Sequence, residues 1–313
     1  MDTDWTYDGQ EDKAYAKGMR LLEAGCVVSE FGTRRRRDYH TQALVFRGLV
    51  KAKKEGEKKG LPGAISGTSN VHLAMRFGIP PIGTVAHEWF MGVAAITGDY
   101  KTATTKALSY WVGCFGEGVL GIALTDTFGT PVFLESFKQP IPRVTTSKTG
   151  DVSEEVATNG SAKTFAEVFT GVRQDSGDPA NFVKIMREFY DKEGIKDKKT
   201  IVFSDSLNID LCLQYKKISD EAGFNTSFGV GTFFTNDFVH NKTGTKSTPL
   251  NIVIKLDSAA GNQAIKISDN IGKNTGDKET VEKVKKELGY VERDWKDGDE
   301  SRRWGTDGEP AKN

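Results

Sequence analysis

The fold class is indicated by the stretch Cys26-Val-Val-Ser-Glu-Phe-Gly-Thr-Arg-Arg-Arg-Arg-Asp-Tyr39. Its first five residues predict a buried strand, which a glycine and four arginines then interrupt. Apolar residues at helical spacing, among them Ala43, Phe46 and Leu49, predict a helix over 39–52 directly afterwards. A strand, a polar loop and an amphipathic helix in this order predict a parallel sheet with helical crossovers.

Similar units follow along the chain. Short apolar runs that end in small or polar residues predict strands near 26–30, 63–67, 79–86, 119–124, 168–173, 200–204, 226–230 and 250–256. Segments with helical periodicity, the first over 11–23, lie between them. The alternation predicts an α/β fold in which parallel strands are joined by helices, as in a barrel.

Two segments lack this alternation of predicted strands and helices. Residues 139–163 are rich in Thr, Ser, Lys, Pro and Gly, which predicts a flexible surface insertion. Residues 277–313 are dominated by Lys, Glu and Asp, which predicts a solvated helix followed by a loose end. We therefore divide the chain into an α/β barrel over 1–276 and a charged tail over 277–313.

The composition excludes several classes of function. The 313 residues include 43 Lys plus Arg and 43 Asp plus Glu, so no overall charge favours nucleic acid or an anionic membrane as a partner. The cysteines, Cys26, Cys114 and Cys212, lack metal-ligand spacing and are typical of reduced thiols inside the cell. No apolar run reaches membrane-spanning length, and the first residues lack the features of a signal peptide. The sequence predicts a soluble protein of the cytoplasm, with the nucleus as an alternative.

His87 is a candidate catalytic residue because it follows the apolar run 79–86, at the expected end of a strand, and precedes a predicted helix. An imidazole titrates near neutral pH and a neighbouring carboxylate can fix its tautomer, so it suits a nucleophile or a proton carrier. The alternative is a structural histidine that is satisfied by hydrogen bonds. His40, His72 and His240 have no clustered polar partners and are expected to be structural or exposed.

Polar clusters follow nearly every predicted strand, and a barrel brings the carboxyl ends of its strands to one face. These clusters lie at 30–37, 67–70, 87–88, 125–127, 173–178, 204–208 and 229–232. Their guanidinium, carboxylate, hydroxyl and glycine groups together suit a sugar that carries several phosphates.

Two of the clusters are expected to bind phosphate. In the arginine run 34–37, a helix start would point Arg34 inward first, with Arg36 or Arg37 second, and leave Arg35 in solvent. The alternatives for this run are a solvated basic turn and a nucleic-acid patch. In the loop 229–232, backbone N–H groups near Gly231 and the Thr232 hydroxyl can hold a terminal phosphate. The alternative there is an ordinary glycine turn.

Acidic residues in these clusters have two alternative roles, ligand contact or helix capping. Asp175, beside the cation Arg173, is available for a ribose hydroxyl or a magnesium-bound water. Asp178 precedes Pro179 and is expected to be a helix N-cap. Asp205 can contact a hydroxyl or a metal, or can belong to a helix cap.

Five of the motifs, in this order, resemble the nicotinate phosphoribosyltransferase family, and look most like its fungal members. They are Ser-Glu-Phe-Gly-Thr-Arg-Arg-Arg-Arg at 29–37, Gly-Thr-Ser-Asn at 67–70, Gly-Thr-Val-Ala-His-Glu-Trp at 83–89, Val-Arg-Gln-Asp-Ser-Gly-Asp-Pro at 172–179 and Phe-Gly-Val-Gly-Thr at 228–232. The resemblance implies the irregular (β/α) barrel of type II phosphoribosyltransferases. Because family members extend further at the N-terminus, it also implies that the barrel is N-terminally incomplete here.

The resemblance implies roles for individual residues. His87 matches the histidine that ATP phosphorylates, Arg173 lies near the base, and Asp126 and Asp175 face ribose or magnesium. Further matches are Phe31 beside the pyridine, Arg34 on phosphoribosyl pyrophosphate, Ser69 at the nicotinate carboxylate, and Gly231 and Thr232 at the 5′-phosphate. Thr68 and Asp205 are additional candidate substrate contacts because of their place in the polar clusters, and not because of the resemblance. No residue is assigned as a protein ligand of a metal.

The implied reaction is the ATP-coupled transfer of phosphoribose from phosphoribosyl pyrophosphate to nicotinate, which gives nicotinate mononucleotide for NAD salvage. ATP is the co-substrate, Mg²⁺ the cofactor, and a homodimer the expected assembly. One alternative is a relative that uses nicotinamide or quinolinate, because these enzymes share the barrel. The other is a catalytically silent barrel fragment that binds a ligand or a full-length partner.

Overall fold

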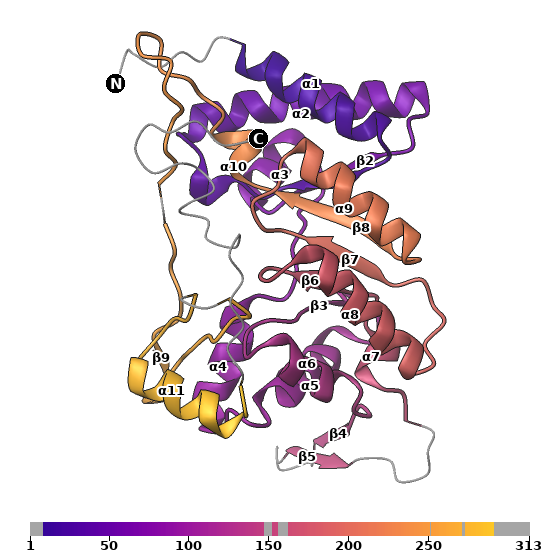
Figure 1. Ribbon diagram of the computed structural model, residues 1–313, viewed down its shortest axis with the longest axis vertical. Coiled ribbons are helices and arrows are strands. Elements are labelled where there is room, and N and C mark those ends of the chain that lie inside the picture. The colour runs from indigo at the N-terminus through magenta and orange to yellow at the C-terminus, as the bar shows by residue number, and fades with distance from the viewer. Residues whose placement is uncertain (1–8, 147–151, 156–161, 251, 271–272, 291–313) are drawn as a thin grey trace. The chain divides into compact units, whose positions relative to one another are not determined.

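The computed structural model describes residues 9–146, 152–155, 162–250, 252–270 and 273–290 (Figure 1). They form two compact units, which are described separately. Among the described residues, unit 1 lies within 9–83 and 202–253, and unit 2 lies within 84–201 and 254–290. Strand β7 (Thr200–Phe203) lies where the two units divide.

Unit 1 contains three parallel strands, β1 (Val27–Glu30), β2 (Ala64–Thr68) and β8 (Asn225–Val230), with β1 in the centre. Its helices are α1 (Gln10–Glu23), the 3-10 helix η1 (Thr33–Arg35), α2 (Tyr39–Lys59), α3 (Val71–Phe77), α9 (Ile209–Glu221) and α10 (Thr232–Thr235). The predicted strands at 26–30, 63–67 and 226–230 are therefore confirmed, as is the helix over 11–23.

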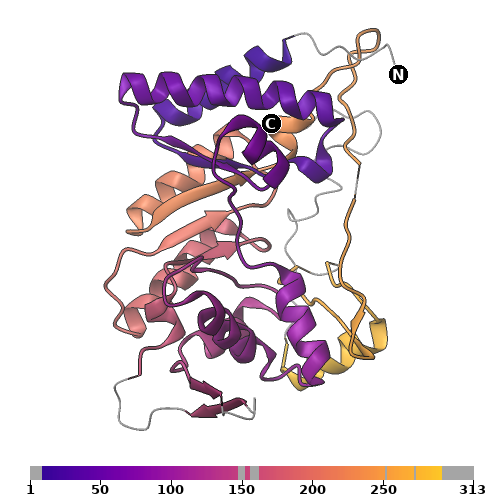
Figure 2. The same cartoon turned by 180° about the vertical axis from the view of Figure 1, so that it is seen from behind.

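Helices α1 and α2 lie side by side along unit 1, as Figures 1 and 2 both show. A Cβ atom on Gly48 of α2 would lie 2.2 Å from the carbonyl oxygen of Glu11, so glycine permits this close approach. The Asp38 carboxylate caps the start of α2 by accepting from Thr41 N at 2.7 Å. Helix α2 continues past the predicted end at 52 as far as Lys59, where Gly60 at φ 66° ends it.

Unit 2 contains the parallel pair β3 (Ile122–Leu124) and β6 (Gly171–Gln174). Its helices are α4 (His87–Thr97), α5 (Ala103–Phe115), α6 (Thr130–Phe137), α7 (Phe165–Val168), α8 (Pro179–Lys192) and α11 (Lys278–Glu287). Short antiparallel pairs join β4 (Arg143–Thr146) to β5 (Val152–Glu155) and β9 (Ser258–Ala259) to β10 (Asn262–Gln263).

An aromatic cluster forms part of the core of unit 2. The ring of Phe137 lies 4.6 Å from Phe133, 5.7 Å from Phe169 and 6.1 Å from Phe189, measured between centroids. These residues come from α6, from the residue after α7, and from α8, so their burial holds these helices together. Parallel strands alternating with helices are found in both units, as the sequence predicts.

Two strand predictions are wrong. Residues 79–86 form only one bridge, between Pro81 and Thr68, because two prolines deprive this run of backbone donors for a ladder. The described residues of 250–256 form no strand, and the side chains of Leu250 and Ile254 are 63% and 76% exposed. Apolar alternation indicates strand propensity, but a strand also needs a neighbour with which to pair.

The predicted insertion and tail are described only in part. The insertion at 139–163 contains β4 and β5, and its residues 147–151 and 156–161 lie outside the described residues. The tail at 277–313 contains α11, and its residues 291–313 lie outside them. None of the helices in the described part of the chain has the length and apolar character that crossing a bilayer requires.

Candidate functional site

A buried cluster of ionisable residues in unit 2 contains His87, Asp126 and Asp175. Their ligand atoms all lie within 4.8 Å of one another. His87 is 4% exposed and Asp126 is 1% exposed, whereas the side chain of Asp175 keeps 20% of its surface. Buried ionisable groups at this density are uncommon unless they pair with one another, so the cluster is a candidate active site.

The parallel pair β3–β6 explains why the two carboxylates meet. Leu124 of β3 is the register partner of Arg173 of β6, and each aspartate follows its strand residue by two positions. Asp126 and Asp175 therefore leave the same sheet edge together. His87 reaches them from the first turn of α4, and not from the end of a strand as the sequence predicts.

Hydrogen bonds on both ring nitrogens fix the imidazole of His87. Its Nε2 lies 3.0 Å from Asp175 Oδ2 and 3.7 Å from Asp126 Oδ1, and its Nδ1 lies 3.0 Å from Thr127 Oγ1. Carboxylate oxygens only accept, so we assign the proton of the neutral ring to Nε2. The lone pair of Nδ1 then accepts from the Thr127 hydroxyl.

Arg173 orients Asp175. Its Nη2 donates to Asp175 Oδ1 at 2.6 Å, while its Nη1 donates to Thr84 Oγ1 at 3.1 Å. Burial alone would raise the pKa of Asp175, but the Arg173 charge and the His87 hydrogen bond hold that pKa well below its usual range. Asp175 is therefore ionised at neutral pH.

Lys266 forms an ion pair with Asp126, as Arg173 does with Asp175. Its Nζ lies 3.2 Å from Asp126 Oδ2, which also accepts from Ser176 Oγ at 2.6 Å. Burial would raise the pKa of Asp126, but the positive charge of Lys266 lowers it below its ordinary value. The other oxygen, Oδ1, is buried and has no hydrogen-bond donor among the described residues.

This unsatisfied oxygen bears on the Mg²⁺ that the resemblance implies. Mg²⁺ prefers carboxylate oxygens and commonly binds through one or two of them together with substrate phosphates. Asp126 Oδ1 offers one such ligand, and Asp175 brings a second carboxylate close to it. The residues present fit a magnesium ion of this kind.

Asp269 lies next to the cluster, and its pKa is raised, whereas the pKa values of Asp126 and Asp175 are lowered. Its Oδ1 accepts from Thr130 N at 2.7 Å and its Oδ2 accepts from Thr130 Oγ1 at 2.5 Å. Burial, followed by the negative charge of Asp126, raises the pKa of Asp269 from its ordinary value of 3.8 to about 6.

We expect Asp269→Asn to change how stability depends on pH. The folded state keeps this proton up to about pH 6, whereas the unfolded chain loses it near 3.8, so the free energy of unfolding falls as pH rises between these values. The loss amounts to at most roughly 3 kcal/mol, and it should be absent in Asp269→Asn. Urea denaturation at pH 4.5 and pH 8 measures it, with Asp178→Asn as the control. Parallel pH profiles of wild type and Asp269→Asn would contradict the shifted pKa.

The strand ends of unit 1 carry a second group of the residues singled out in the sequence. Glu30 is the register partner of both Thr68 and Val230, so the loops after β1, β2 and β8 start side by side. Phe31 N donates to Val230 O at 2.8 Å, and Ser69 N donates to Glu30 O at 2.9 Å. The parallel register thus brings Phe31, Thr68 and Ser69 together.

The loop 229–232 adjoins Phe31. A Cβ atom on Gly229 would lie 2.5 Å from Cδ2 of the Phe31 ring, so this ring position requires glycine at 229. Gly231 precedes α10, and Thr232 is the first residue of that helix. That this loop binds phosphate stays a prediction.

The arginine run differs from the expected arrangement. Arg34 is exposed and Arg35 is half-buried, which reverses the predicted order. Arg36 Nη1 donates to Gln42 Oε1 at 2.9 Å, and Arg37 Nη1 donates to Ser247 Oγ at 3.3 Å. The reversal arises because Arg34 and Arg35 lie in the short 3-10 helix η1, in which successive side chains point in other directions than in an α-helix.

The structure confirms the predicted cap at Asp178 and places the cap in the run 204–208 on Asn208 and not on Asp205. Asp178 caps α8 by accepting from Ala180 N at 2.9 Å. In the run 204–208 the cap of α9 is Asn208, which accepts from Leu211 N at 2.9 Å. Asp205 itself is 8% exposed and accepts from Ser206 Oγ at 3.0 Å. Its contact with a substrate or a metal stays a prediction.

Sequence reasoning missed Lys266 and Asp269 as members of the cluster. Thr127 and Ser176 lie in the polar runs 125–127 and 173–178, but the sequence did not single them out. An isolated lysine normally lies in solvent, and no motif surrounds Lys266, so the sequence does not mark it as a residue of the site. The available signal is its apolar neighbourhood, because Ala264, Ile265 and Ile267 are all fully buried.

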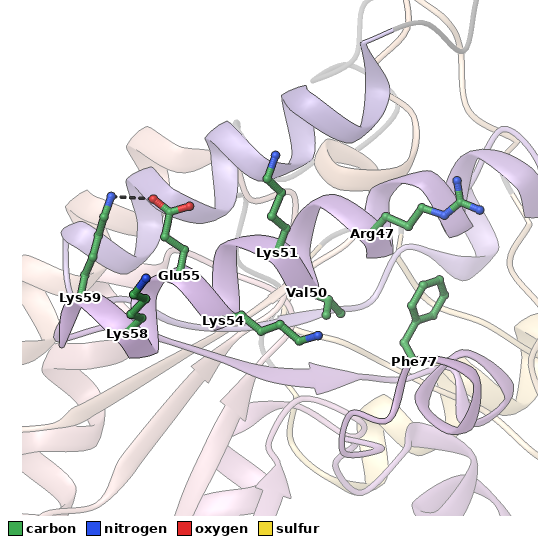
Figure 3. Close-up of a pocket in the computed structure, with 8 residues that line it drawn as sticks. All are labelled: Arg47, Val50, Lys51, Lys54, Glu55, Lys58, Lys59 and Phe77. Carbon is green, nitrogen blue, oxygen red and sulfur yellow. Dashed lines mark ion pairs between the residues drawn. The ribbon is translucent and has the colours of Figure 1, made fainter.

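A surface cavity of about 760 Å³ lies in unit 1 (Figure 3). The cavity is lined from α3 by Phe77, and along α2 by Arg47, Val50, Lys51, Lys54, Glu55, Lys58 and Lys59. Figure 3 shows the basic side chains spreading apart along the helix, with Lys59 paired to Glu55. Such spreading is typical of a solvated helix face.

Comparison with known proteins shows the family of the chain. Residues 26–292 match the model of the nicotinate phosphoribosyltransferase (NAPRTase) family. The chain is 44% identical over 307 residues to nicotinate phosphoribosyltransferase of Saccharomyces cerevisiae, covering 97% of this chain and 66% of that protein. It is 47% identical over 291 residues to the probable nicotinate phosphoribosyltransferase of Schizosaccharomyces pombe, covering 92% and 65%.

Solved structures are also similar. A crystal structure from Saccharomyces cerevisiae has a TM-score of 0.81 at 44% identity, over 93% of this chain and 65% of that chain. Nicotinate phosphoribosyltransferase from Porphyromonas gingivalis has a TM-score of 0.72 at 32% identity, over 90% and 64%. The chain spans just under two thirds of the length of these relatives. On this similarity, the chain belongs to the nicotinate phosphoribosyltransferase family.

Proposed function

We propose that the protein transfers phosphoribose from phosphoribosyl pyrophosphate to nicotinate, coupled to ATP, giving nicotinate mononucleotide for NAD salvage. The observation that supports it most strongly is the buried cluster of His87, Asp126 and Asp175 in a chain of this family. A histidine held by a carboxylate suits phosphoryl transfer, and two ionised carboxylates suit a sugar cation.

His87 is the proposed acceptor of the ATP phosphoryl group. In the neutral imidazole the lone pair is on Nδ1. It attacks the γ-phosphorus, a bond between Nδ1 and phosphorus forms, and the bond between that phosphorus and the ADP oxygen breaks. Asp175 holds the ring in one tautomer at 3.0 Å. The added phosphate brings about −1.5 to −2 charges, which can reorganise neighbouring loops. Water later cleaves the nitrogen–phosphorus bond and restores the histidine.

The carboxylates and cations of the cluster act on the glycosyl transfer. As pyrophosphate leaves the anomeric carbon, positive charge develops on the ribose, and Asp126 and Asp175 stabilise it electrostatically. Arg173 would neutralise the nicotinate carboxylate or the leaving group. Asp126 and Asp175 would hold Mg²⁺, which when bound supplies positive charge to the pyrophosphate oxygens. The pyridine nitrogen then attacks, and its ring needs positioning more than activation.

The resemblance assigns further substrate contacts to residues of unit 1. Phe31 flanks the pyridine ring, and Ser69 faces its carboxylate. Arg34, Gly231 and Thr232 bind phosphates, and Thr68 and Asp205 of the polar clusters are further candidate contacts. The homodimer and the cytoplasmic location stay predictions from the resemblance.

A comparison of three pyridines tests the function. We expect the chain, given phosphoribosyl pyrophosphate, Mg²⁺ and ATP, to release pyrophosphate with nicotinate and not with nicotinamide or quinolinate. Chromatography of labelled pyridines measures the mononucleotide formed, and omission of ATP should lower the rate. Turnover with either other pyridine would favour the alternative substrate. Binding of phosphoribosyl pyrophosphate without turnover would favour the silent fragment.

A further inference from the structure

Glu30 is a buried carboxylate that the proposed reaction does not use. It lies at the carboxyl end of β1 and is 1% exposed. Transfer of a carboxylate out of water is costly unless several donors compensate for the lost hydration. Glu30 lies at the point where the loop after β1 begins, beside the starts of the loops after β2 and β8.

Three donors from three different elements converge on this carboxylate. Oε1 accepts from Gly32 N at 2.6 Å and from Gln42 Nε2 at 3.0 Å, and Oε2 accepts from Thr68 Oγ1 at 2.7 Å. These groups belong to the loop after β1, to α2 and to the end of β2. Burial raises the pKa of Glu30, and the three hydrogen bonds oppose that rise.

A second layer of hydrogen bonds extends from the same donors. Gln42 Nε2 also donates to Thr33 Oγ1 at 2.9 Å, and Asn70 Nδ2 donates to the same hydroxyl at 3.1 Å. Asn70 N donates to Thr68 Oγ1 at 3.0 Å, while Asn70 Oδ1 caps α3. The loops 31–37 and 67–70 are therefore joined through groups that Glu30 holds directly.

The segment 231–235, which contains α10, is held against the loop after β1 at Gly32. Thr235 Oγ1 donates to Gly32 O at 3.0 Å. A Cβ atom on Gly32 would lie 2.3 Å from Thr235 Oγ1 and 2.7 Å from Gly231 O, so the two loops are in close contact. The position of Gly32, set partly by Glu30, thus also sets the start of α10.

We propose that Glu30 is a positioning residue that holds the three strand-end loops of unit 1 in the conformation that binds phosphoribosyl pyrophosphate. Arg34, Ser69 and Thr232 lie on these loops and would meet the substrate without first being ordered. A preordered loop avoids the entropic cost of ordering on binding, so Glu30 acts on substrate affinity more than on the chemical step. This inference rests on the proposed function.

Two variants of Glu30 test the proposal. Glu30→Gln keeps the shape and removes the charge, and Glu30→Ala removes all three hydrogen bonds. In the ligand-free protein we expect faster amide hydrogen exchange at 31–37, 67–70 and 231–235 than in wild type. In steady-state assays we expect KM for phosphoribosyl pyrophosphate to rise about tenfold or more, as the loss of charge-assisted hydrogen bonds implies, while kcat changes less than about threefold.

Val45→Ala is the matched control, because Val45 is a buried residue of α2 that is 1% exposed and is not part of this network. It should lower stability without changing KM or exchange in the three loops. If Glu30→Ala does not fold, Glu30→Gln decides the question alone. Loop exchange as in wild type, or kcat that falls while KM stays constant, would overturn the inference. Wild type without turnover would contradict the proposed function, and the exchange data would still decide whether Glu30 orders the loops.

Discussion

In the His87→Asn variant, incubation with γ-labelled ATP is expected to leave the protein without the acid-labile phosphate that the wild type acquires. Asparagine is close in size to part of the imidazole but has no lone-pair nitrogen, so no nitrogen–phosphorus bond can form. His87 is 4% exposed, and asparagine can still bond to Asp175, so the fold should be retained. ATP stimulation of mononucleotide formation should be lost with the label.

His72→Asn is the matched control for this experiment. His72 lies on α3, is exposed, and bonds to Tyr39 Oη at 2.7 Å. The variant should acquire phosphate as the wild type does. Label that persists in His87→Asn would place the phosphate on another residue and would contradict the role of His87.

The second large effect is expected for Asp175→Asn, whose kcat should fall about 10²- to 10⁴-fold, in the range for loss of a positioned acid–base partner. The amide can donate from Nδ2 to His87 Nε2, which would move the ring proton to Nδ1 and reverse the tautomer. It also removes a negative charge opposite Arg173, so the guanidinium at 2.6 Å loses its ion pair. Both changes weaken phosphorylation and glycosyl transfer.

Asp178→Asn serves as the control because it lies three positions further along the same loop. Asp178 caps α8, and asparagine is an equally good N-cap, so stability and kcat should remain near the wild-type values. Steady-state rates at saturating substrates give the comparison. Equal kcat values for wild type and Asp175→Asn would show that the carboxylate is not needed.

Much of the fold could be predicted because its signals are local. The carboxylate of Asp178 before α8 is a cap that its residue type and the following Pro179 predict. The end of α2 was predicted at 52, and Gly60 ends that helix instead. The strand predictions failed at 79–86 and 250–256, where pairing depends on distant backbone and not on the local apolar pattern.

The candidate site could be predicted only where its residues stand in strand-end motifs. Arg173 and Asp175 share the motif after β6, and Asp126 follows the neighbouring parallel strand β3, so their presence in one site follows from parallel topology. His87 joins them from the first turn of α4, which the strand prediction at 79–86 did not anticipate. Lys266 has no motif signal, and the motif 29–37 gives no indication that Glu30 is buried. A lysine is expected in solvent, and a glutamate at a strand end is expected to contact water or ligand, whereas both side chains are buried and paired here.

The sequence by itself determined the alternation of strands and helices, the helix caps and the five motifs that identify the family, because each depends on residues close together in the chain. Only the tertiary structure decided which groups carry charge and where His87 points. His87 and Asp175 are 88 positions apart, and Lys266 comes to Asp126 from a still later segment. Protonation states follow from burial and from neighbouring charges, and both exist only after distant segments have packed together.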